Sequence, residues 1–216
     1  MVVSQRQILL KDGTACLLRS PEPEDADKLL QYLKEICSET DNLTRYPDEL
    51  TQTVEQERQF IQNMAKSRRD AMLAAFVQER LIGNVSLNPV GEAEKLRHRA
   101  TVGLGVLQKY WGLGLGKRLL ETVLALAPSL GYEQVELEVL SSNHRGLALY
   151  RRMGFEECGR TPQAFRLRDG GYEDETLMFY RCPPPAKIFL GRRPVRNTGP
   201  RTPAAGSASG GLSGPD

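Results

Sequence analysis

The sequence predicts a mixed α/β fold, because short runs of strand-forming residues alternate with longer runs that have helical spacing. The clearest strand is 134–140, in which Val135, Leu137 and Val139 alternate with polar residues. The clearest helix is 143–153, which is followed by a glycine in the position where glycine commonly ends a helix. In chain order we expect an N-terminal strand or hairpin, two helices and three strands. A helix, a strand, a second helix and two final strands follow.

The N-terminal half is predicted to contain two hairpins with two helices between them. Its strands are expected at 8–10, 15–19, 72–77 and 81–87, and its helices open at 20–25 and at Thr53. Thr53 and Gln56 have the spacing of a capping box, which fixes the start of the second helix. The apolar side chains that the two helices are expected to bury are Ala26, Leu29, Leu30, Leu33, Ile36 and Cys37, and then Val54, Phe60, Ile61 and Met64.

The C-terminal half is predicted to continue the alternation of strands and helices. A strand at 97–108 leads through a glycine-rich turn into a helix at 115–127, which ends near Pro128. After the strand and helix named above, two last strands at 155–168 and 172–181 flank an Arg-Asp-Gly-Gly turn typical of a hairpin.

The composition is that of an ordinary globular domain and argues against several classes of protein. Hydrophobic residues make up 40% and charged residues 26% of the 216 residues, and the formal net charge is only +2. Such a charge gives no reason to expect a nucleic-acid or membrane partner. No apolar run approaches the roughly 20 residues that span a bilayer, and the N-terminus lacks the apolar region of a signal peptide. Because the four cysteines are widely spaced and there are only two histidines, we expect no metal site and a cytoplasmic location.

The chain is predicted to divide into a folded domain at 1–182 and a tail at 183–216. The tail holds seven prolines and six glycines, with five basic side chains and one acidic side chain. Because it has few large apolar residues, burial cannot offset the entropy of ordering it, and we expect it to be disordered. A role as a basic arm for an acidic partner is the alternative.

Three alternate glycines, Gly112, Gly114 and Gly116, lie between a predicted strand and a predicted helix. Without side chains, backbone N–H groups at a helix N-terminus can approach an anion closely, and the helix dipole favours negative charge there. The segment therefore predicts a phosphate cradle, with a tight turn that needs glycine only for its positive φ as the alternative. Lys117 replaces the last glycine of a dinucleotide fingerprint, and Arg118 replaces the Ser or Thr of a P-loop, so neither of these nucleotide motifs is present.

The segment from Trp111 to Gly116 resembles motif A of the GNAT (Gcn5-related N-acetyltransferase) superfamily, Arg/Gln-x-x-Gly-x-Gly after a strand that ends in valine. Val106 closes the strand here, and Trp111 stands in the Arg or Gln position. Downstream, residues 143–155 look like the family's N-x-x-A-x-x-L-Y-x-x-x-G-F motif, with Gly146 in place of the first alanine. With both motifs in order, the folded domain resembles bacterial-type small acetyltransferases of this superfamily, and the tail lies outside the resemblance.

The resemblance implies a central sheet, mixed but mostly antiparallel and flanked by helices, which splays between the strands at 97–108 and 134–140 to take acetyl-CoA as co-substrate. The pantetheine arm would lie along the exposed edge of Leu104, Gly105 and Val106 like an added strand. Asn143 would contact the pantetheine region, and a role as helix N-cap competes with this one. The N–H groups that would hold the pyrophosphate are those of Gly112, Leu113, Gly114, Leu115, Gly116 and Lys117.

The resemblance also implies two catalytic residues. Tyr150 matches the tyrosine that protonates the departing thiolate of coenzyme A, and the alternative is a half-buried aromatic that anchors its helix. Glu138 matches a glutamate of some relatives, among them ribosomal-protein alanine acetyltransferases, and would take the proton of the attacking amine. Glu136 falls on the same strand face, and two solvated glutamates are the alternative. A catalytic cysteine is not expected, because the family transfers the acetyl group directly within a ternary complex.

Together these features predict an acetyl-CoA-dependent N-acetyltransferase that acts on a primary amine. The alternative is a module of the same fold that binds acyl-CoA without catalysis. The acceptor is expected to be a small molecule or a peptide, bound by a monomer or homodimer. In the family, the loop between the first two helices and the last hairpin wall the acceptor cleft. Both segments carry carboxylates here, which favour a cationic amine; the alternative is that they are simply charged surface loops.

Overall fold

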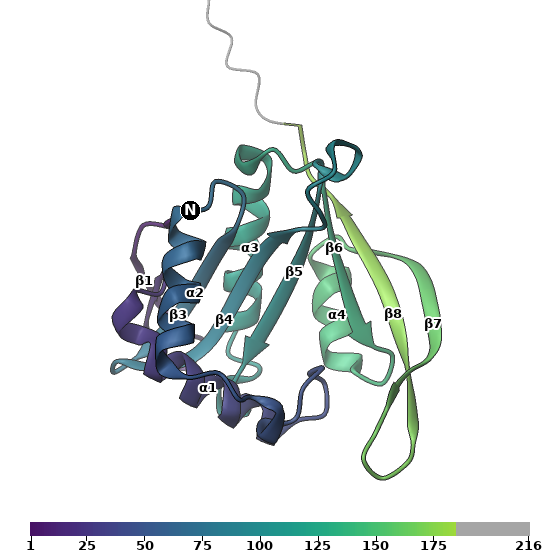
Figure 1. Cartoon of the computed structure of the whole chain (residues 1–216), viewed down its shortest axis with the longest axis horizontal. Coiled ribbons are helices and arrows are strands. Elements are labelled where there is room, and N and C mark those ends of the chain that lie inside the picture. The colour runs from purple at the N-terminus through teal and green to yellow at the C-terminus, as the bar shows by residue number, and fades with distance from the viewer. Residues whose placement is uncertain (185–216) are drawn as a thin grey trace, which may run out of the picture. The chain divides into compact units, whose positions relative to one another are not determined.

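The computed structural model describes residues 1–184, and within them the predicted elements form one eight-stranded sheet with helices on both faces (Figure 1). The strands are β1 (Arg6–Leu9), β2 (Ala15–Arg19), β3 (Ala71–Val77), β4 (Arg80–Pro89), β5 (Arg99–Val106), β6 (Gln134–Leu140), β7 (Glu156–Arg166) and β8 (Tyr172–Arg181). The α-helices are α1 (Ala26–Glu39), α2 (Val54–Lys66), α3 (Leu115–Leu126) and α4 (His144–Arg152). The predicted disordered tail lies, apart from its first two prolines, outside the described residues.

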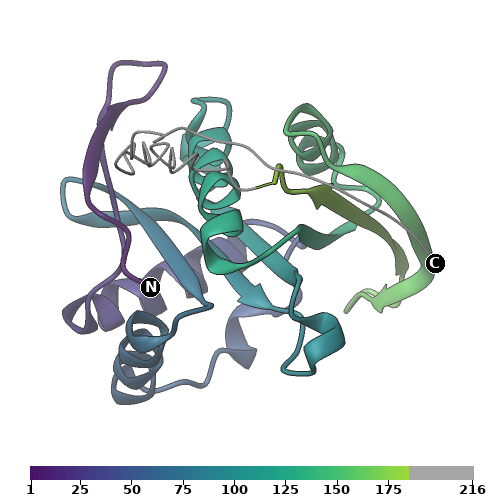
Figure 2. The same cartoon turned by 90° about the horizontal axis from the view of Figure 1, so that it is seen from above.

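The sheet is mixed and mostly antiparallel, as predicted. Its strand order is β1-β2-β3-β4-β5-β6-β8-β7, and within the described residues only β5 and β6 pair in parallel. All other neighbouring strands of this sheet pair in antiparallel fashion. Helices α1 and α2 lie on one face of the sheet and α3 and α4 on the other, as the view from above shows (Figure 2).

The two central strands separate part of the way along. β5 pairs with β6 only over 99–101, opposite 134–136, whereas β5 continues to Val106 and β6 to Leu140. On its other side β5 stays paired with β4 as far as Val106. The edge of residues 102–106 that faces β6 is therefore left without a strand partner, and β5 and β6 diverge in Figure 1. This confirms the predicted splay.

The helices bury narrower faces than their sequences predict. The capping box at Thr53 forms as predicted, and Ile61 and Met64 are buried. The prediction for Val54 and Phe60 is wrong, because these side chains are 38% and 44% exposed. Since α2 packs mainly against α1 at the outside of the domain, one narrow stripe of its surface meets the core.

In α1 the aromatic Tyr32 is buried, whereas Leu33 and Cys37, predicted as core, are half-buried. The hydroxyl of Tyr32 donates to Asn84 Oδ1 at 3.1 Å, which explains how a polar group is accommodated under the helix. A side chain on Gly105 would meet this hydroxyl at 2.5 Å, so α1 covers β5 closely at this point.

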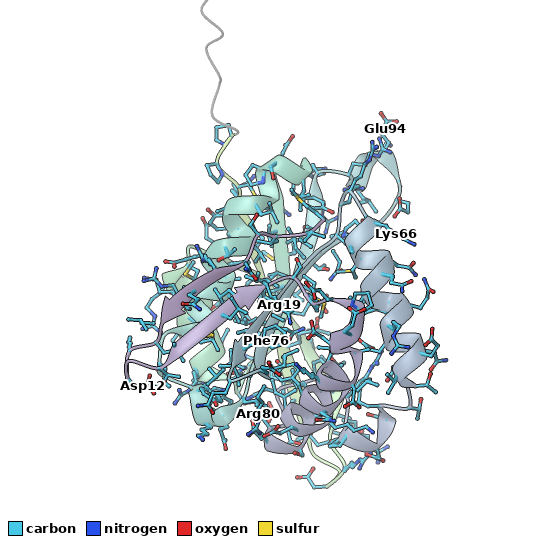
Figure 3. The ribbon with its side chains drawn as sticks, turned by 90° about the vertical axis from the view of Figure 1, so that its left-hand side faces the viewer. Asp12, Arg19, Lys66, Phe76, Arg80 and Glu94 are labelled. Carbon is cyan, nitrogen blue, oxygen red and sulfur yellow. The ribbon has the colours of Figure 1, made fainter. Side chains whose placement is uncertain are left out.

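The β1–β2 hairpin is fastened to the body at its base and at its tip. At the base, Arg19 and the buried Asp25 form two hydrogen bonds of 2.5 and 2.9 Å, and the Arg19 guanidinium lies 4.2 Å from the centre of the Phe76 ring. Figure 3 shows Arg19 and Phe76 together on this side of the molecule, with Asp12 at the hairpin tip. At the tip, the backbone N–H of Lys11 donates to the Leu113 carbonyl at 3.1 Å, which connects the hairpin to the glycine turn.

Candidate functional site

The three glycines of the turn after β5 have two different structural roles. Gly112 and Gly114 have φ of 79° and 88°, in the left-handed region that glycine adopts most readily. Gly114 is also the N-cap of α3. Gly116 has no positive φ, but a Cβ there would lie 3.3 Å from Leu149 Cδ2. Two glycines therefore shape the turn, and the third lets α4 pack against the first turn of α3.

The turn leaves a row of backbone donors without acceptors. None of the six N–H groups of residues 112–117 donates a hydrogen bond to another described residue. The next N–H, that of Arg118, begins the helix by donating to the Gly114 carbonyl at 3.2 Å. Such donors at the positive end of a helix dipole suit a phosphate-sized anion. The residues predicted to hold a pyrophosphate are thus brought together next to the unpaired edge of β5.

Trp111, the departure from motif A, has a structural role of its own. Its indole N–H donates to the Val106 carbonyl at 2.6 Å and so holds the turn against the end of β5. The Arg145 guanidinium lies 5.0 Å from the centre of its ring. A cation from the first turn of α4 is therefore held close to the glycine turn, where the motif would otherwise supply an Arg or Gln side chain.

Asn143 caps α4, as the alternative interpretation of this residue predicts. Its Oδ1 accepts the Gly146 N–H at 2.9 Å, and this capping contact explains the glycine at 146. A Cβ on that residue would lie 2.8 Å from Asn143 Nδ2. The Nδ2 group itself donates to no other described residue, and its contact with a cofactor stays a prediction.

Tyr150 lies on α4 and packs edge-on against Phe155, with the ring centres 5.7 Å apart. It is half-buried, and burial raises the pKa of its phenol to about 12. Its hydroxyl makes no hydrogen bond to another residue in the range 1–184. At neutral pH the side chain is therefore a protonated, unengaged donor, which is the state required of a general acid.

Glu136 and Glu138 lie on the face of the sheet that α1 and α2 occupy, opposite α4. Leu104 faces α3 and α4, because its side chain lies next to Gly116 of α3. Thr101 is three residues earlier on β5, so its side chain points to the opposite face. Glu136 is the register partner of Thr101 and shares that face. Two residues further on, Glu138 lies on the same face, where β6 has already separated from β5. Tyr150 and Glu138 thus belong to opposite faces of the sheet, one on each side of the splay.

The two glutamates have different surroundings. Glu136 accepts hydrogen bonds of 2.5 and 2.6 Å from Arg99 and one of 2.7 Å from Gln134. The Arg99 guanidinium holds the pKa of Glu136 below its usual value. Glu138 is exposed and makes no hydrogen bond or ion pair with a described residue, which leaves it available as a base.

Glu175 is a diagonal neighbour of Glu138, a position that the sequence alone does not indicate. Glu138 is opposite Leu177 on β8, and Glu175 is two residues along the same strand face. Burial, and then the negative charge of Glu138, raise the pKa of Glu175. Only the register between β6 and β8 places these carboxylates together.

A groove of about 440 Å³ lies on the α1 and α2 side of the C-terminal strands. It begins near Glu138, where the strands separate, and continues along β6 and β8. Its lining residues are Arg99, Gln134, Glu136, Leu137, Glu138, Cys158, Leu177, Met178, Phe179 and Arg181. The groove combines an apolar floor with charged side chains, as binding sites for small polar groups commonly do.

The loop between α1 and α2, residues 40–52, is anchored at both sides of the splay. Just before the loop, Glu39 accepts the Gln108 N–H at 2.7 Å, next to the end of β5. Within it, Asp48 accepts two hydrogen bonds of 2.7 Å from Arg168, in the β7–β8 turn. The Arg168 guanidinium also lies 3.9 Å from the centre of the Tyr46 ring. We call residues 40–52 the strap, because they connect the β5 side of the opening to the last hairpin.

Two further findings concern what residues 1–184 could bind. No group of three or more His, Cys, Asp and Glu side chains in this range is placed to hold a metal ion. The helices of the same range include none with the length and apolar character needed to cross a membrane.

Comparison with known proteins identifies similar sequences and folds. A sequence profile of the acetyltransferase (GNAT) family matches residues 28–155. N-acetyltransferase 8B of Rattus norvegicus is 34% identical over 83 residues, which are 38% of this chain and 37% of that protein. The match thus spans little more than a third of that relative's length.

Solved structures match over most of the described residues. An acetyltransferase of the GNAT family from Streptococcus pneumoniae has a TM-score of 0.74 and 28% identity, over 77% of this chain and 99% of that one. The Salmonella typhimurium protein yncA, solved with its cofactor acetyl-CoA, has a TM-score of 0.68 at 17% identity, over 77% of this chain and 93% of that one. The second likeness shows the fold alone.

Proposed function

Because the chain belongs to the GNAT acetyltransferase family, we propose that it transfers an acetyl group from acetyl-CoA to a primary amine, by direct attack within a ternary complex. One observation carries the proposal. Within residues 1–184, a row of six backbone N–H groups without acceptors lies beside a strand edge without a partner. A phosphate group matches the first and an extended pantetheine amide chain matches the second.

The donor would enter between β5 and β6 from the side of α3 and α4. Its pyrophosphate would accept hydrogen bonds from residues 112–117, with the Arg145 guanidinium nearby as a countercharge. Its pantetheine arm would pair with the free edge of Leu104, Gly105 and Val106. The acetyl group would then lie in the splay, where both faces of the sheet can be reached.

The amine would approach from the opposite face, along the groove that contains Glu138. A free alkylammonium is protonated at pH 7, so a base must remove a proton before the nitrogen can attack. Glu138 can do this directly or through water, whereas Glu136 is held by Arg99. As the tetrahedral intermediate collapses and the C–S bond breaks, Tyr150 would give its phenolic proton to the departing sulfur.

The other features are consistent with this activity. All four cysteines are free thiols, which supports a reducing, cytoplasmic location. Monomer and homodimer both stay predictions. The second candidate is a module of this fold that binds acyl-CoA without catalysis, and the departure at Trp111 is the feature that favours it.

The deciding experiment measures thiol release from acetyl-CoA with the full chain and a panel of primary amines. The panel should contain polyamines, aminoglycosides, lysine derivatives and peptides with free amino termini. Amine-dependent thiol release together with an acetylated product supports the proposal. Tight acetyl-CoA binding without release for any amine would favour the non-catalytic module, and absence of binding would contradict both.

A further inference from the structure

The groove beside Glu138 has opposite charges at its two ends. Glu138 lines the groove at the splay end, and Glu175, its diagonal neighbour across β6 and β8, lies next to this end. The middle of the floor contains Leu177 and Phe179. Glu136 lies opposite Phe179, where it is paired with Arg99. At the other end lies Arg181, on the same face of β8 because it is separated from these residues by even numbers of positions.

Of the two arginines that line this groove, Arg181 is the one without a salt-bridge partner among the residues that the structure describes. The other arginine, Arg99, is paired with Glu136 through two hydrogen bonds. Arg181 has no carboxylate within 4.0 Å among residues 1–184, and its guanidinium lies 5.3 Å from the centre of the Phe179 ring. The aromatic ring orients the guanidinium and leaves its N–H groups free for an external acceptor.

The register gives the separation of the two charged ends. Glu138 is opposite Leu177, and Arg181 lies four residues further along β8. At 3.2–3.4 Å per residue, the two positions are about 13 Å apart. The side chains of Leu177, Phe179 and Arg181 follow each other at about 6.7 Å, which is also the spacing of alternate side chains in an extended peptide.

The strap determines the direction in which an acceptor can extend from Glu138. It joins the end of β5 to the β7–β8 turn through Glu39 and through Asp48 with Arg168. Both anchors lie at the splay end, so an acceptor whose amine lies at Glu138 extends away from the strap when it follows the groove along β8 toward Arg181.

We propose that the groove selects a peptide amino terminus that carries an acidic side chain at its third to fifth residue. The inference rests on the proposed function and names the class of its acceptor. The ammonium group is attracted to Glu138 and Glu175, residues one and three lie over Leu177 and Phe179, and the acidic group reaches Arg181. Polyamines and lysine-rich peptides bring a positive charge to Arg181 and are disfavoured.

The test compares three amidated pentapeptides with free amino termini, Ala-Gly-X-Gly-X, in which X is Glu, Gln or Lys. Thiol release from acetyl-CoA by the full chain is measured at low ionic strength. We expect kcat/KM to be about tenfold higher for the Glu peptide than for the Lys peptide, with the Gln peptide between them. The preference should shrink in 0.5 M salt, because the charges at the groove are open to solvent.

Charge reversal supplies the matched control. Arg181→Glu should invert the order of the peptides, whereas Arg152→Glu, the same change on the exposed surface of α4, should keep it. Equal rates for the three peptides, or an order that Arg181→Glu does not alter, would overturn the inference and leave the proposed function intact. Free small amines turning over faster than every peptide would overturn it as well. Absence of thiol release with every amine, despite intact acetyl-CoA binding, contradicts the proposed function itself.

Discussion

Replacing Gly114 with aspartate tests whether the row of N–H groups binds a phosphate. The change has two physical parts, which can be separated. At φ of 88° any side chain strains the backbone, by about 1–2 kcal/mol for a residue with a Cβ. The new Cβ would meet only the stem of Lys11, at 3.7 Å, so no clash adds to the strain. The second part is the negative charge of the carboxylate, placed at the mouth of the cradle.

The charge term sets the expected loss of affinity. Two like charges 4 Å apart repel by about 1 kcal/mol in bulk water and about 4 kcal/mol at an effective dielectric constant of 20. The Lys11 ammonium can offset part of this, and we take the lower part of the range. We expect the Kd for acetyl-CoA to rise at least tenfold, which corresponds to about 1.4 kcal/mol.

Gly114→Asn is the matched control, because it has the same shape and backbone strain without the charge. Both variants should lose the same few degrees of thermal stability, whereas calorimetric titration with acetyl-CoA should separate them by about tenfold in Kd. If the two variants bind acetyl-CoA equally well, a negative charge at this position does not affect the Kd for acetyl-CoA. The phosphate would then lie elsewhere.

Three further predictions concern the groups on either side of the splay and the base of the β1–β2 hairpin. Glu138→Gln should lower turnover most at low pH, where deprotonating the amine is hardest, with partial rescue at high pH; an unchanged pH–rate profile would show that Glu138 is not the base. Tyr150→Phe should lower kcat by roughly 10²-fold with acetyl-CoA affinity within a few-fold of the original, and a smaller loss for acyl thioesters with better leaving groups would distinguish acid catalysis from packing. Asp25→Asn should destabilise the fold by about 3 kcal/mol in urea titrations at pH 7, because it leaves the partly buried Arg19 without its partner. Burial alone would raise the pKa of Asp25, but the hydrogen bonds from Arg19 and the Glu22 N–H keep it below its usual value. The stability difference between the original chain and Asp25→Asn should therefore be complete above the unfolded pKa of about 3.9 and disappear as pH falls through the folded pKa. A stability difference that persists below the folded pKa would contradict the assignment.

The sequence predicts the order of the elements and the location of the glycine turn, because both depend on local patterns. Thr53 and Gln56 form their capping box, and Gly154 follows α4 with φ of 88°, since these choices are made within a few residues. The positions of Leu104 and Glu138 on opposite faces of the sheet also follow from strand alternation, once the pairing is known.

The contacts that surround the candidate site depend on long-range packing. Nothing near Glu136 in the sequence indicates that Arg99 neutralises it, because the pair exists only in the register of β5 with β6. The same holds for the bond between Asp48 and Arg168, which are 120 residues apart. The spacing of Phe60 alone predicts a core position, but Phe60 is exposed because α2 packs against the body on only one side.

The splay explains why a donor and an acceptor can meet in the middle of a sheet. Paired strands would separate the face of α4 from the face of α1, and a group on one face could not act on a bond formed on the other. Where β5 and β6 separate, a thioester held at the free edge of β5 is open to both faces. In the proposed mechanism Glu138 receives a proton on the acceptor side while Tyr150 supplies one on the donor side, without either group crossing the sheet. The interrupted pairing at Thr101 and Glu136 is thus a requirement of the proposed chemistry, and closing it would remove activity even with both side chains in place.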